Sequence, residues 1–412
     1  MFALLAIPLC LFAGTAIDYT RASSAQSALN AAADAAALSA TTPGAMAQTT
    51  AKARAAALDM FNARAAEIGL AESVKPTIKV HDADGQRTAT VAYTAEVPTT
   101  LMQLAKVKTV SITGESATSS SRPLYMDFYL LLDNSPSMGL AATTADIAKM
   151  EAATKEVEGP SGCAFACHDL SGSRNTLPIA RSAGVSLRID VVRSATQRLI
   201  DTAMAIAAVP GQFRAALYTF GSSCSSLGLT TISSLTSNLS SVKAGASAID
   251  LMTIPYVSPS FVQCTDYEGI FSDVKNAVPS SGDGASASDP QKLLFFVSDG
   301  VADANRPSTC TERVELTDWQ TVPRCQEPMR EAFCKALKDR GVRIAVLHTT
   351  YLPLPSNDHY RDWIAPFSSR IGPKMEACAS PGLYFEVSPA QGIAEAMEAL
   401  FRKAVSQARL TR

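Results

Sequence analysis

Two short segments of the chain end in oxygen-bearing side chains whose spacing suits a divalent cation. In the first, Phe-Tyr-Leu-Leu-Leu is followed by Asp-x-Ser-x-Ser, which places the carboxylate of Asp133 and the hydroxyls of Ser135 and Ser137 on one loop. The second, Lys292–Gly300, is also an apolar run, and it ends in Asp299. Carboxylate and hydroxyl oxygens are hard ligands, which suit Mg²⁺ or Mn²⁺ better than a soft metal.

The two apolar runs predict how these side chains are positioned. Each run is short, continuous and bounded by turn-forming residues, which is typical of a strand buried on both faces of a parallel sheet. The carboxyl ends of such strands meet at one edge of an open α/β sheet, where ligands bind. We therefore expect Asp133 and Asp299 to lie together. The alternative is that each segment forms only a helix cap or a turn.

Strands and helices alternate along the rest of the chain from Leu124 to Arg412, which predicts an α/β fold with a doubly wound, mostly parallel sheet. Two insertions, residues 155–187 and 307–325, leave the carboxyl edge of this sheet. Long structured loops over a binding site usually set its specificity, although these two could also be padding held by disulfides. The other expected elements are strands at 213–220, 341–347 and 383–387 and a helix at 327–340.

The Asp-x-Ser-x-Ser loop and the later Asp-Gly loop resemble the metal-ion-dependent adhesion site of von Willebrand factor type A domains, and the alternation over residues 124–412 covers that whole Rossmann-like fold. The resemblance implies Mg²⁺ bound by Asp133, Ser135 and Ser137. It also implies that Asp299 and a threonine from a second loop act directly or through water. An Asp or Glu of a protein partner would complete the octahedron.

The threonine is the least certain ligand, because the Gly-Gly-Thr signature of the family is absent. Thr265 is favoured, since Thr-Asp-Tyr-Glu at this point has the pattern of a capping box that opens a helix through Val278. Thr230, Thr231 and Thr253 remain alternatives.

Nine cysteines are present: Cys10 near the N-terminus and eight others between Cys163 and Cys378. An even number in that region indicates disulfides and an oxidising compartment. Zinc is disfavoured because C-x₂-C pairs are missing, and the Cys-x₃-Cys-His sequence has one residue too many for haem attachment. The predicted pairs are Cys163–Cys167, Cys224–Cys264, Cys310–Cys325 and Cys334–Cys378.

The first residues, from Met1 to Ile17, are apolar and carry no charge. At about 1.5 Å per residue this run reaches about 25 Å, the lower limit of a membrane span, so we expect a transmembrane anchor over residues 1–20. A cleaved signal peptide is the alternative, but no basic segment precedes the apolar run and helical character continues through Ala40. The natural start of the protein is expected upstream.

Residues 21–118 change from helical to strand periodicity. Alanine-rich sequence predicts a helix to Ala40 and a second one over about 45–68. Alternating residues around Val80, Val91 and Val110 then predict a small antiparallel sheet. The apolar start, Ile-Asp-Tyr at 17–19 and the alanine run at 31–38 resemble the N-terminal region of TadE/TadG-like pilus assembly proteins. The serine-rich stretch 116–123 is taken as the domain boundary.

Composition and motifs disfavour several functions. The formal net charge of −2 provides no electrostatic footprint for nucleic acid. No Gly-x-Ser-x-Gly elbow or phosphate-binding loop is present, and none of the four histidines lies in a catalytic motif, so we expect no enzyme. The resemblances imply a bacterial inner-membrane pilus assembly or adhesion protein, periplasmic or extracellular beyond its anchor. The alternative is a structural envelope anchor in which any metal only stabilises the fold.

Overall fold

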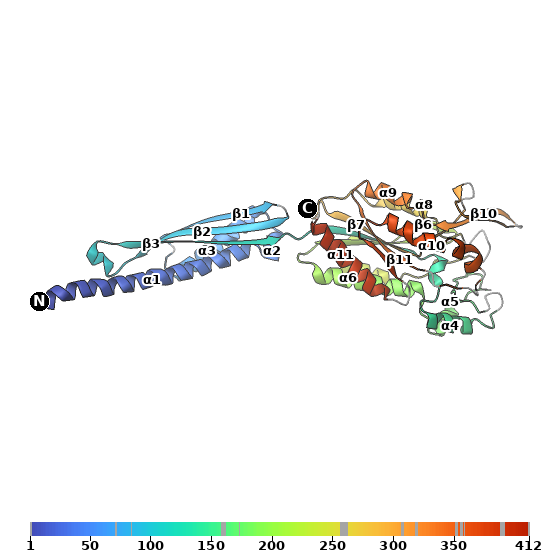
Figure 1. Cartoon of the computed structure of the whole chain (residues 1–412), viewed down its shortest axis with the longest axis horizontal. Coiled ribbons are helices and arrows are strands. Elements are labelled where there is room, and N and C mark those ends of the chain that lie inside the picture. The colour runs from blue at the N-terminus through green and yellow to red at the C-terminus, as the bar shows by residue number, and fades with distance from the viewer. Residues whose placement is uncertain are drawn as a thin grey trace. The chain divides into compact units, whose positions relative to one another are not determined.

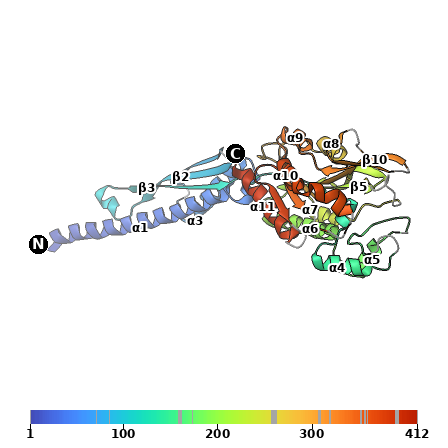
Figure 2. The same ribbon diagram turned by 45° about the vertical axis from the view of Figure 1, so that its right-hand side comes forward.

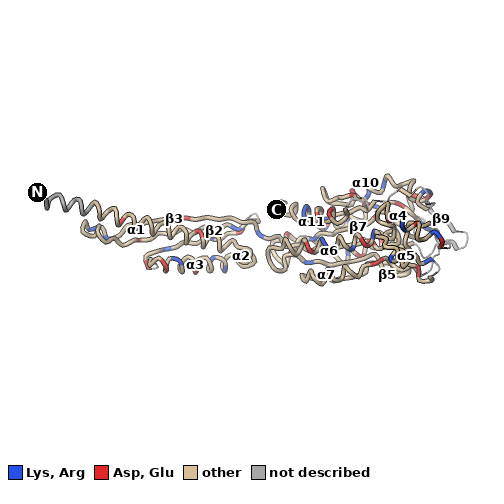
Figure 3. Tube along the Cα trace, turned by 90° about the horizontal axis from the view of Figure 1, so that it is seen from below, with Lys and Arg blue, Asp and Glu red and all other residues tan. Residues whose placement is uncertain are grey.

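The computed structural model describes residues 2–410, apart from residues 71, 84, 158–161, 173, 256–262, 306–308, 318–319, 351–352, 355–356, 358 and 388–391. Among the remaining residues, the side chains of 2–11, 313–317, 320–323 and 409–410 are not described. The chain divides into two compact units, Met1–Pro123 and Leu124–Thr411. Charged residues of both signs are interspersed along the trace of each unit (Figure 3).

The Met1–Pro123 unit packs helices against one face of an antiparallel sheet of order β1-β2-β3 (Figure 1). Its core is rich in alanine, which lets α1 approach α3 and the sheet closely; Ala33, Ala57 and Ala89 have no exposed surface. The elements are α1 (Phe2–Ala40), α2 (Pro43–Met46), α3 (Thr50–Glu67), β1 (Val74–Ala83), β2 (Gln86–Pro98), the 3₁₀ helix η1 (Met102–Ala105) and β3 (Thr109–Ser121).

The predicted elements of this unit are present, but the second long helix begins at Thr50 rather than near residue 45, and β3 is longer than expected. Residues 116–121 continue the strand, where Ser116 lies opposite Val91 and Ser121 opposite Gln86. Alternating serines and threonines can pair through the backbone without an apolar run to mark them. The division between the units falls after Pro123, at the predicted start of the second domain, and the serines up to Ser121 belong to the first unit.

The expected anchor, residues 1–20, lies partly outside the described residues, because the side chains of residues 1–11 are not described. In the part of the chain that the structure describes, no helix combines the length and the apolarity needed to cross a membrane.

The Leu124–Thr411 unit is built on a six-stranded sheet whose neighbouring strands are parallel except for β6, which is antiparallel to β5. The mixed α/β fold and the mostly parallel sheet are confirmed. The strands, in their order across the sheet, are β12 (Tyr384–Val387), β11 (Arg343–Thr349), β7 (Gln291–Ser298), β4 (Met126–Leu132), β5 (Phe213–Ser223) and β6 (Ser226–Thr236).

Helices cover both faces of this sheet (Figure 2). Phe128 and Leu130 of β4 pack in the core on one face, and Tyr129 and Leu131 pack in the core on the other, which explains the continuous apolar run. One face is covered by α6 (Arg188–Ile206), α7 (Leu239–Ala246) and α11 (Ile393–Leu410), and the other by α8 (Tyr267–Ala277), α9 (Ala332–Lys338) and α10 (Ser368–Cys378).

The two insertions carry structure of their own. The first contains α5 (Leu177–Ser182), which follows α4 (Thr144–Ala153). The second contributes to a small antiparallel sheet of order β8-β10-β9. Its strands are β8 (Val301–Ala304), β9 (Arg313–Thr317) and β10 (Gln320–Pro328). Elsewhere in the unit, the short helices are η2 (Pro136–Gly139), η5 (Tyr360–Ile364) and η6 (Ala365–Phe367). The expected helix at 327–340 was thus placed too early, since pairing of β10 with β8 keeps residues 325–328 extended.

Three of the predicted disulfides are confirmed, with Cα–Cα distances of 4.8–5.7 Å: Cys224–Cys264, Cys310–Cys325 and Cys334–Cys378. The predicted Cys163–Cys167 disulfide is wrong, because both residues are free thiols. Hydrogen bonds already fix this loop: the N–H of Cys163 donates to Thr154 Oγ1 at 2.9 Å, and the N–H of Cys167 donates to Thr176 Oγ1 at 2.8 Å.

Candidate metal site at the carboxyl edge of the sheet

The two predicted carboxylates follow adjacent strands at the point where the strand order reverses. From β4 the chain continues to β5 on one side, and from β7 it continues through β8–β10 to β11 on the other side. Such a switch point leaves a crevice outside the carboxyl ends of the strands, where open α/β sheets bind ligands. Asp133 directly follows β4 and Asp299 directly follows β7, and neither side chain is exposed.

Hydrogen bonds orient the first loop around Asp133. Its Oδ1 accepts the N–H of Ser135 at 2.8 Å, and its Oδ2 accepts the hydroxyl of Ser298 at 2.6 Å. Ser135 Oγ lies 3.0 Å from Ser137 Oγ. The structure therefore brings together one carboxylate and two hydroxyls of the predicted ligand set on one short, hydrogen-bonded loop.

Asp299 has a different set of contacts. Its Oδ1 accepts the N–H of Val301 at 3.1 Å. Its Oδ2 is buried and accepts no hydrogen bond from any described residue, although Nη1 of Arg188 lies 3.6 Å away. The side chains of Asp299 and Arg188 are both fully buried. A buried carboxylate oxygen without a hydrogen-bond donor is unfavourable, and a cation beside it would satisfy it.

The electrostatics at Asp133 also favour an added cation. Burial, together with the negative charge of Asp299, raises the pKa of Asp133 well above its usual range. Its hydrogen bonds with Ser135 and Ser298 act in the opposite direction, but they do not outweigh burial. Hard oxygen ligands and two buried carboxylates thus fit a divalent ion of the Mg²⁺ type.

The sequence analysis did not include three residues that contact these carboxylates or their partners: Arg188, Tyr267 and Ser298. Tyr267 Oη lies 2.6 Å from the oxygen of Ser298, which in turn donates to Asp133. Ser298 could have been found, because it is the polar residue that ends the apolar run of β7. Arg188 also carried a signal, since it lies four residues before Val192 on the apolar stripe of α6.

Thr265, the favoured threonine, opens onto the same cavity as the loop of Ser137. Its backbone pairs with Asp303 through hydrogen bonds of 2.9 and 3.0 Å, its side chain is buried, and it lines the same cavity as Ser137. The predicted capping role is wrong, because the cap of α8 is Asp266, which accepts the N–H of Gly269 at 3.3 Å.

The alternative threonines have contacts of their own. Thr253 donates its hydroxyl to the carbonyl of Ser222 at 3.2 Å. Thr230 and Thr231 lie within the β6 ladder, opposite Thr219 and Tyr218 of β5. Met252, next to Thr253, donates its N–H to the carbonyl of Asn134 in the same loop at 2.9 Å, so Thr253 remains a candidate beside Thr265.

A cavity of about 470 Å³ opens beside Ser137 and Thr265. Residues of both insertions contribute to its wall, and Arg324 is held there by Asp303 through a forked pair, with Nε 2.8 Å from Oδ1. Gln326 adds a hydrogen bond of 3.0 Å to the same carboxylate. The cavity is also lined by Pro136, Cys163, Phe165, Cys167, Arg174, Val301, Asn357, His359 and Ile364.

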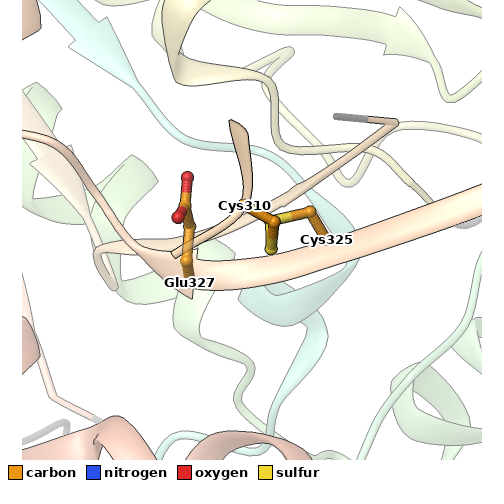
Figure 4. A group of neighbouring side chains, drawn as sticks. All are labelled: Cys310, Cys325 and Glu327. Carbon is orange, nitrogen blue, oxygen red and sulfur yellow. A yellow bond between two sulfur atoms is a disulfide. The ribbon is translucent and has the colours of Figure 1, made fainter. Parts of the chain in front are cut away.

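A second group of metal-ligand side chains, Cys310, Cys325 and Glu327, is not a metal site (Figure 4). The two sulfurs form a disulfide and so offer no thiolate. The carboxylate of Glu327 accepts the hydroxyl of Thr311 at 2.6 Å and lies 2.7 Å from Arg330. Its charge is therefore already compensated.

Comparisons with known proteins match only part of the chain by sequence. Residues 1–58 match the family described as "Putative Flp pilus-assembly TadE/G-like". No curated protein matches the chain.

Several solved structures are similar at low sequence identity. The von Willebrand factor domain of the type V pili tip protein Mfa5 from Porphyromonas gingivalis is 12% identical, with 69% of this chain and 96% of that chain covered and a TM-score of 0.39. The pilus adhesin SpaC from Lactobacillus rhamnosus GG is 11% identical, with coverages of 82% and 34% and a TM-score of 0.36. The structure of the three N-terminal domains of Mfa5 is 11% identical, with 79% of this chain and 55% of that chain covered and a TM-score of 0.34. Values this low assign neither a fold nor a function by themselves.

Proposed function

We propose that this chain is a pilus-associated envelope protein whose Leu124–Thr411 unit captures an acidic group of a protein partner through bound Mg²⁺ or Mn²⁺. One observation supports the proposed metal: two fully buried carboxylates, Asp133 and Asp299, follow adjacent strands at the switch point of the sheet. The pilus assignment is supported by the TadE/G-like match over residues 1–58.

Each residue of the site has a distinct part in this proposal. Asp133 would be the principal charged ligand, and Ser135 and Ser137 would add neutral oxygens. Thr265 and Asp299 would act directly or through water. Arg188 offsets one of the two carboxylates, so an ion of charge +2 would leave one net positive charge, which attracts an acidic partner group.

The cavity beside Ser137 and Thr265 gives the partner a way in. Its volume of about 470 Å³ lies within the range of ligand pockets. A segment of the partner would enter with an Asp or Glu directed toward the ion. Because residues of both insertions line the cavity, the insertions would select the residues beside that carboxylate.

We propose binding rather than catalysis at this site. His348 is a candidate base, but its Nε2 donates to the backbone carbonyl of Asp299 at 3.2 Å. Burial also lowers the pKa of His348, which favours the neutral ring. It therefore supports the loop instead of activating Ser135 or Ser137.

We also propose that the protein lies outside the cytoplasm, attached to the inner membrane by its N-terminal segment. The three disulfides suit an oxidising compartment. The uncharged apolar run up to Ile17 supports the attachment. In spheroplasts, protease added from outside should digest the Leu124–Thr411 unit. If this unit is protected until the inner membrane is broken, the location is wrong.

A second function, a structural envelope anchor without metal-dependent binding, is favoured by one observation. Arg188 already supplies a buried positive charge 3.6 Å from Asp299. In that case Arg188 itself compensates the charge of Asp299, and an added metal would at most stabilise the loop.

Metal-dependent capture of a partner separates the two functions. The full chain would be immobilised and used to recover proteins from envelope extracts with Mg²⁺ or with EDTA. Asp133→Asn is the test variant, and Asp201→Asn, which alters a surface pair with Lys243, is the control. We expect capture in Mg²⁺ alone, lost in Asp133→Asn and kept in Asp201→Asn. Capture that survives EDTA would favour the structural anchor.

A further inference from the structure

Large apolar side chains are exposed at one end of the Met1–Pro123 unit. Phe12 on α1 is 78% exposed, and Leu104 in η1 is 79% exposed. The tip surface, as we call it, consists of Phe12, Ile17, Tyr19, Leu101, Leu104 and Val107. An exposed apolar group of this kind marks an interaction site more often than a random surface does.

The loop between β2 and β3 is fixed to α1 at the level of these residues. The carboxylate of Asp18 is buried and accepts the N–H groups of Thr100, Leu101 and Met102 at 2.7–2.9 Å. Close packing adds to this, since a Cβ at Gly14 would lie 2.6 Å from the Cβ of Leu101. The loop is therefore held against the side of α1 that carries Gly14 and Asp18, at the level of the exposed helix residues.

The charges at this level are suited to an anionic surface. Lys106 and Lys108 are exposed, and they are the only charged residues between 99 and 108. On the helix, Arg21 is exposed, whereas the negative charge of Asp18 is buried against backbone N–H groups. Lys106 has φ of 64°, a conformation that glycine adopts more readily. Position 106 therefore holds a lysine although glycine would adopt this backbone conformation more readily.

We propose that residues 99–108 form a second membrane contact beside α1. Leu101, Leu104 and Val107 enter the headgroup region, and Lys106 and Lys108 pair with the phosphates of anionic lipids. Exposed Tyr19 suits the same interface, where aromatic side chains with a polar end are enriched. The uncharged apolar run that precedes Phe12 along the chain places the tip surface next to the bilayer. This inference rests on the proposed attachment to the inner membrane.

Depth-dependent fluorescence quenching tests this contact on the full chain in vesicles of phosphatidylcholine and phosphatidylglycerol. Leu104→Trp places a probe in the loop, and Leu58→Trp places a matched probe on α3, where Leu58 is also exposed. The signal of the two natural tryptophans is measured in the unchanged chain and subtracted. We expect brominated lipids to quench the tryptophan at 104 and to leave the one at 58 unchanged.

The outcomes separate this contact from the attachment itself. If the chain does not float with vesicles at all, the proposed attachment fails. If it floats but position 104 is quenched no more than position 58, the loop contact is overturned, and the tip surface is left for a protein partner.

The two lysines have their own test. Changing Lys106 and Lys108 together to Ser should weaken binding to anionic vesicles by roughly 10- to 30-fold, at about fivefold per basic residue. Changing Lys52 and Arg54 of α3 to Ser is the control and should have no such effect, since these exposed residues lie on another element. An equal loss from both pairs would mean that total charge, and not the loop, determines binding.

Discussion

Asp133 carries the main electrostatic cost of the site, because it is buried beside a second carboxylate. In the folded state its pKa is raised to about 7 by burial and by Asp299. The folded protein therefore holds this proton more tightly than the unfolded chain. In the absence of metal, the contribution of Asp133 to stability is fully present below its unfolded pKa and is lost as the pH rises through about 7.

Replacing Asp133 with Asn should remove this cost along with the proposed metal ligand. The amide cannot ionise, so at pH 8 without metal we expect the variant to be more stable than the unchanged chain by about 1–3 kcal/mol. Mg²⁺ should stabilise the unchanged chain and have no effect on the variant. Thermal unfolding in EDTA and in Mg²⁺ measures both effects. A variant less stable than the unchanged chain in EDTA would show that Asp133 has a structural role independent of metal.

Arg188 distinguishes a metal site from a site that uses its own cation. Arg188→Met removes the positive charge beside Asp299, so the metal-free protein should lose about 3–5 kcal/mol, as when one partner of a buried pair is removed. If a metal binds here, the uncompensated carboxylate should bind Mg²⁺ more tightly, by roughly tenfold or more. Calorimetric titration compares the two affinities. Equal destabilisation with and without Mg²⁺ would favour the structural anchor.

At the residue scale, a local pattern could predict Asp133, Ser135, Ser137 and Asp299, because each follows or ends an apolar run in the sequence. It could not predict the partners of these residues. Arg188 meets Asp299 across more than 100 residues, and Tyr267 reaches Ser298 across the fold. Which long-range pairs form depends on how the helices pack on the sheet, and no periodicity encodes that.

At the scale of elements, the disulfide Cys224–Cys264 holds the loop that carries Thr265. Cys224 follows β5, and Cys264 directly precedes Thr265. Cys334–Cys378 joins α9 to α10 and closes a loop of similar length, and neither cysteine adjoins a proposed ligand in the sequence. The two bonds thus form a matched pair for testing what positions Thr265.

Removing either disulfide by Cys→Ser changes should cost about 2–4 kcal/mol of stability. Only loss of Cys224–Cys264 should also weaken Mg²⁺ binding, because it frees the Thr265 loop. Chemical unfolding gives the stability, and titration of Mg²⁺ under native conditions gives the affinity. If both variants bind Mg²⁺ as the unchanged chain does, Thr265 is not a ligand or needs no covalent support.

Strands buried on both faces could be predicted from the sequence, as could the edge strand β12, whereas the edge strand β6 could not. β4, β7 and β11 have continuous apolar runs, since helices cover both faces of the sheet. β6 is an edge strand of serines, threonines and leucines, with no continuous apolar run to mark it. β10 lies in an insertion and is set by pairing with β8 and β9, so its position is fixed by tertiary contacts.

At the scale of the whole molecule, the two units should respond to acid in opposite ways. In the Met1–Pro123 unit, the hydrogen bond with Arg87 lowers the pKa of Asp82. Arg87 is fully buried and also donates to the carbonyl of Gln48. A depressed folded pKa contributes stability above the unfolded pKa, near 4, and this stability is lost as the pH falls through the folded value. Asp133 in the other unit has the opposite sign.

Calorimetry of the full chain should therefore show two transitions that can be assigned by pH and metal. From pH 8 to 5.5 in EDTA, the transition of the Leu124–Thr411 unit should move to higher temperature as Asp133 takes up its proton, and the other should stay. At pH 8, Mg²⁺ should raise the same transition, and at pH 5.5 it should do so less because the proton competes for the ligand. Below about pH 4, the Met1–Pro123 transition should move to lower temperature as Asp82 is protonated.

Asp133→Asn should remove the responses of the Leu124–Thr411 transition to pH and to Mg²⁺, and it should keep the acid response of the Met1–Pro123 transition. A single transition that shifts as a whole would show that the two units unfold together, and Mg²⁺ stabilisation that grows on acidification would rule out Asp133 as the ligand.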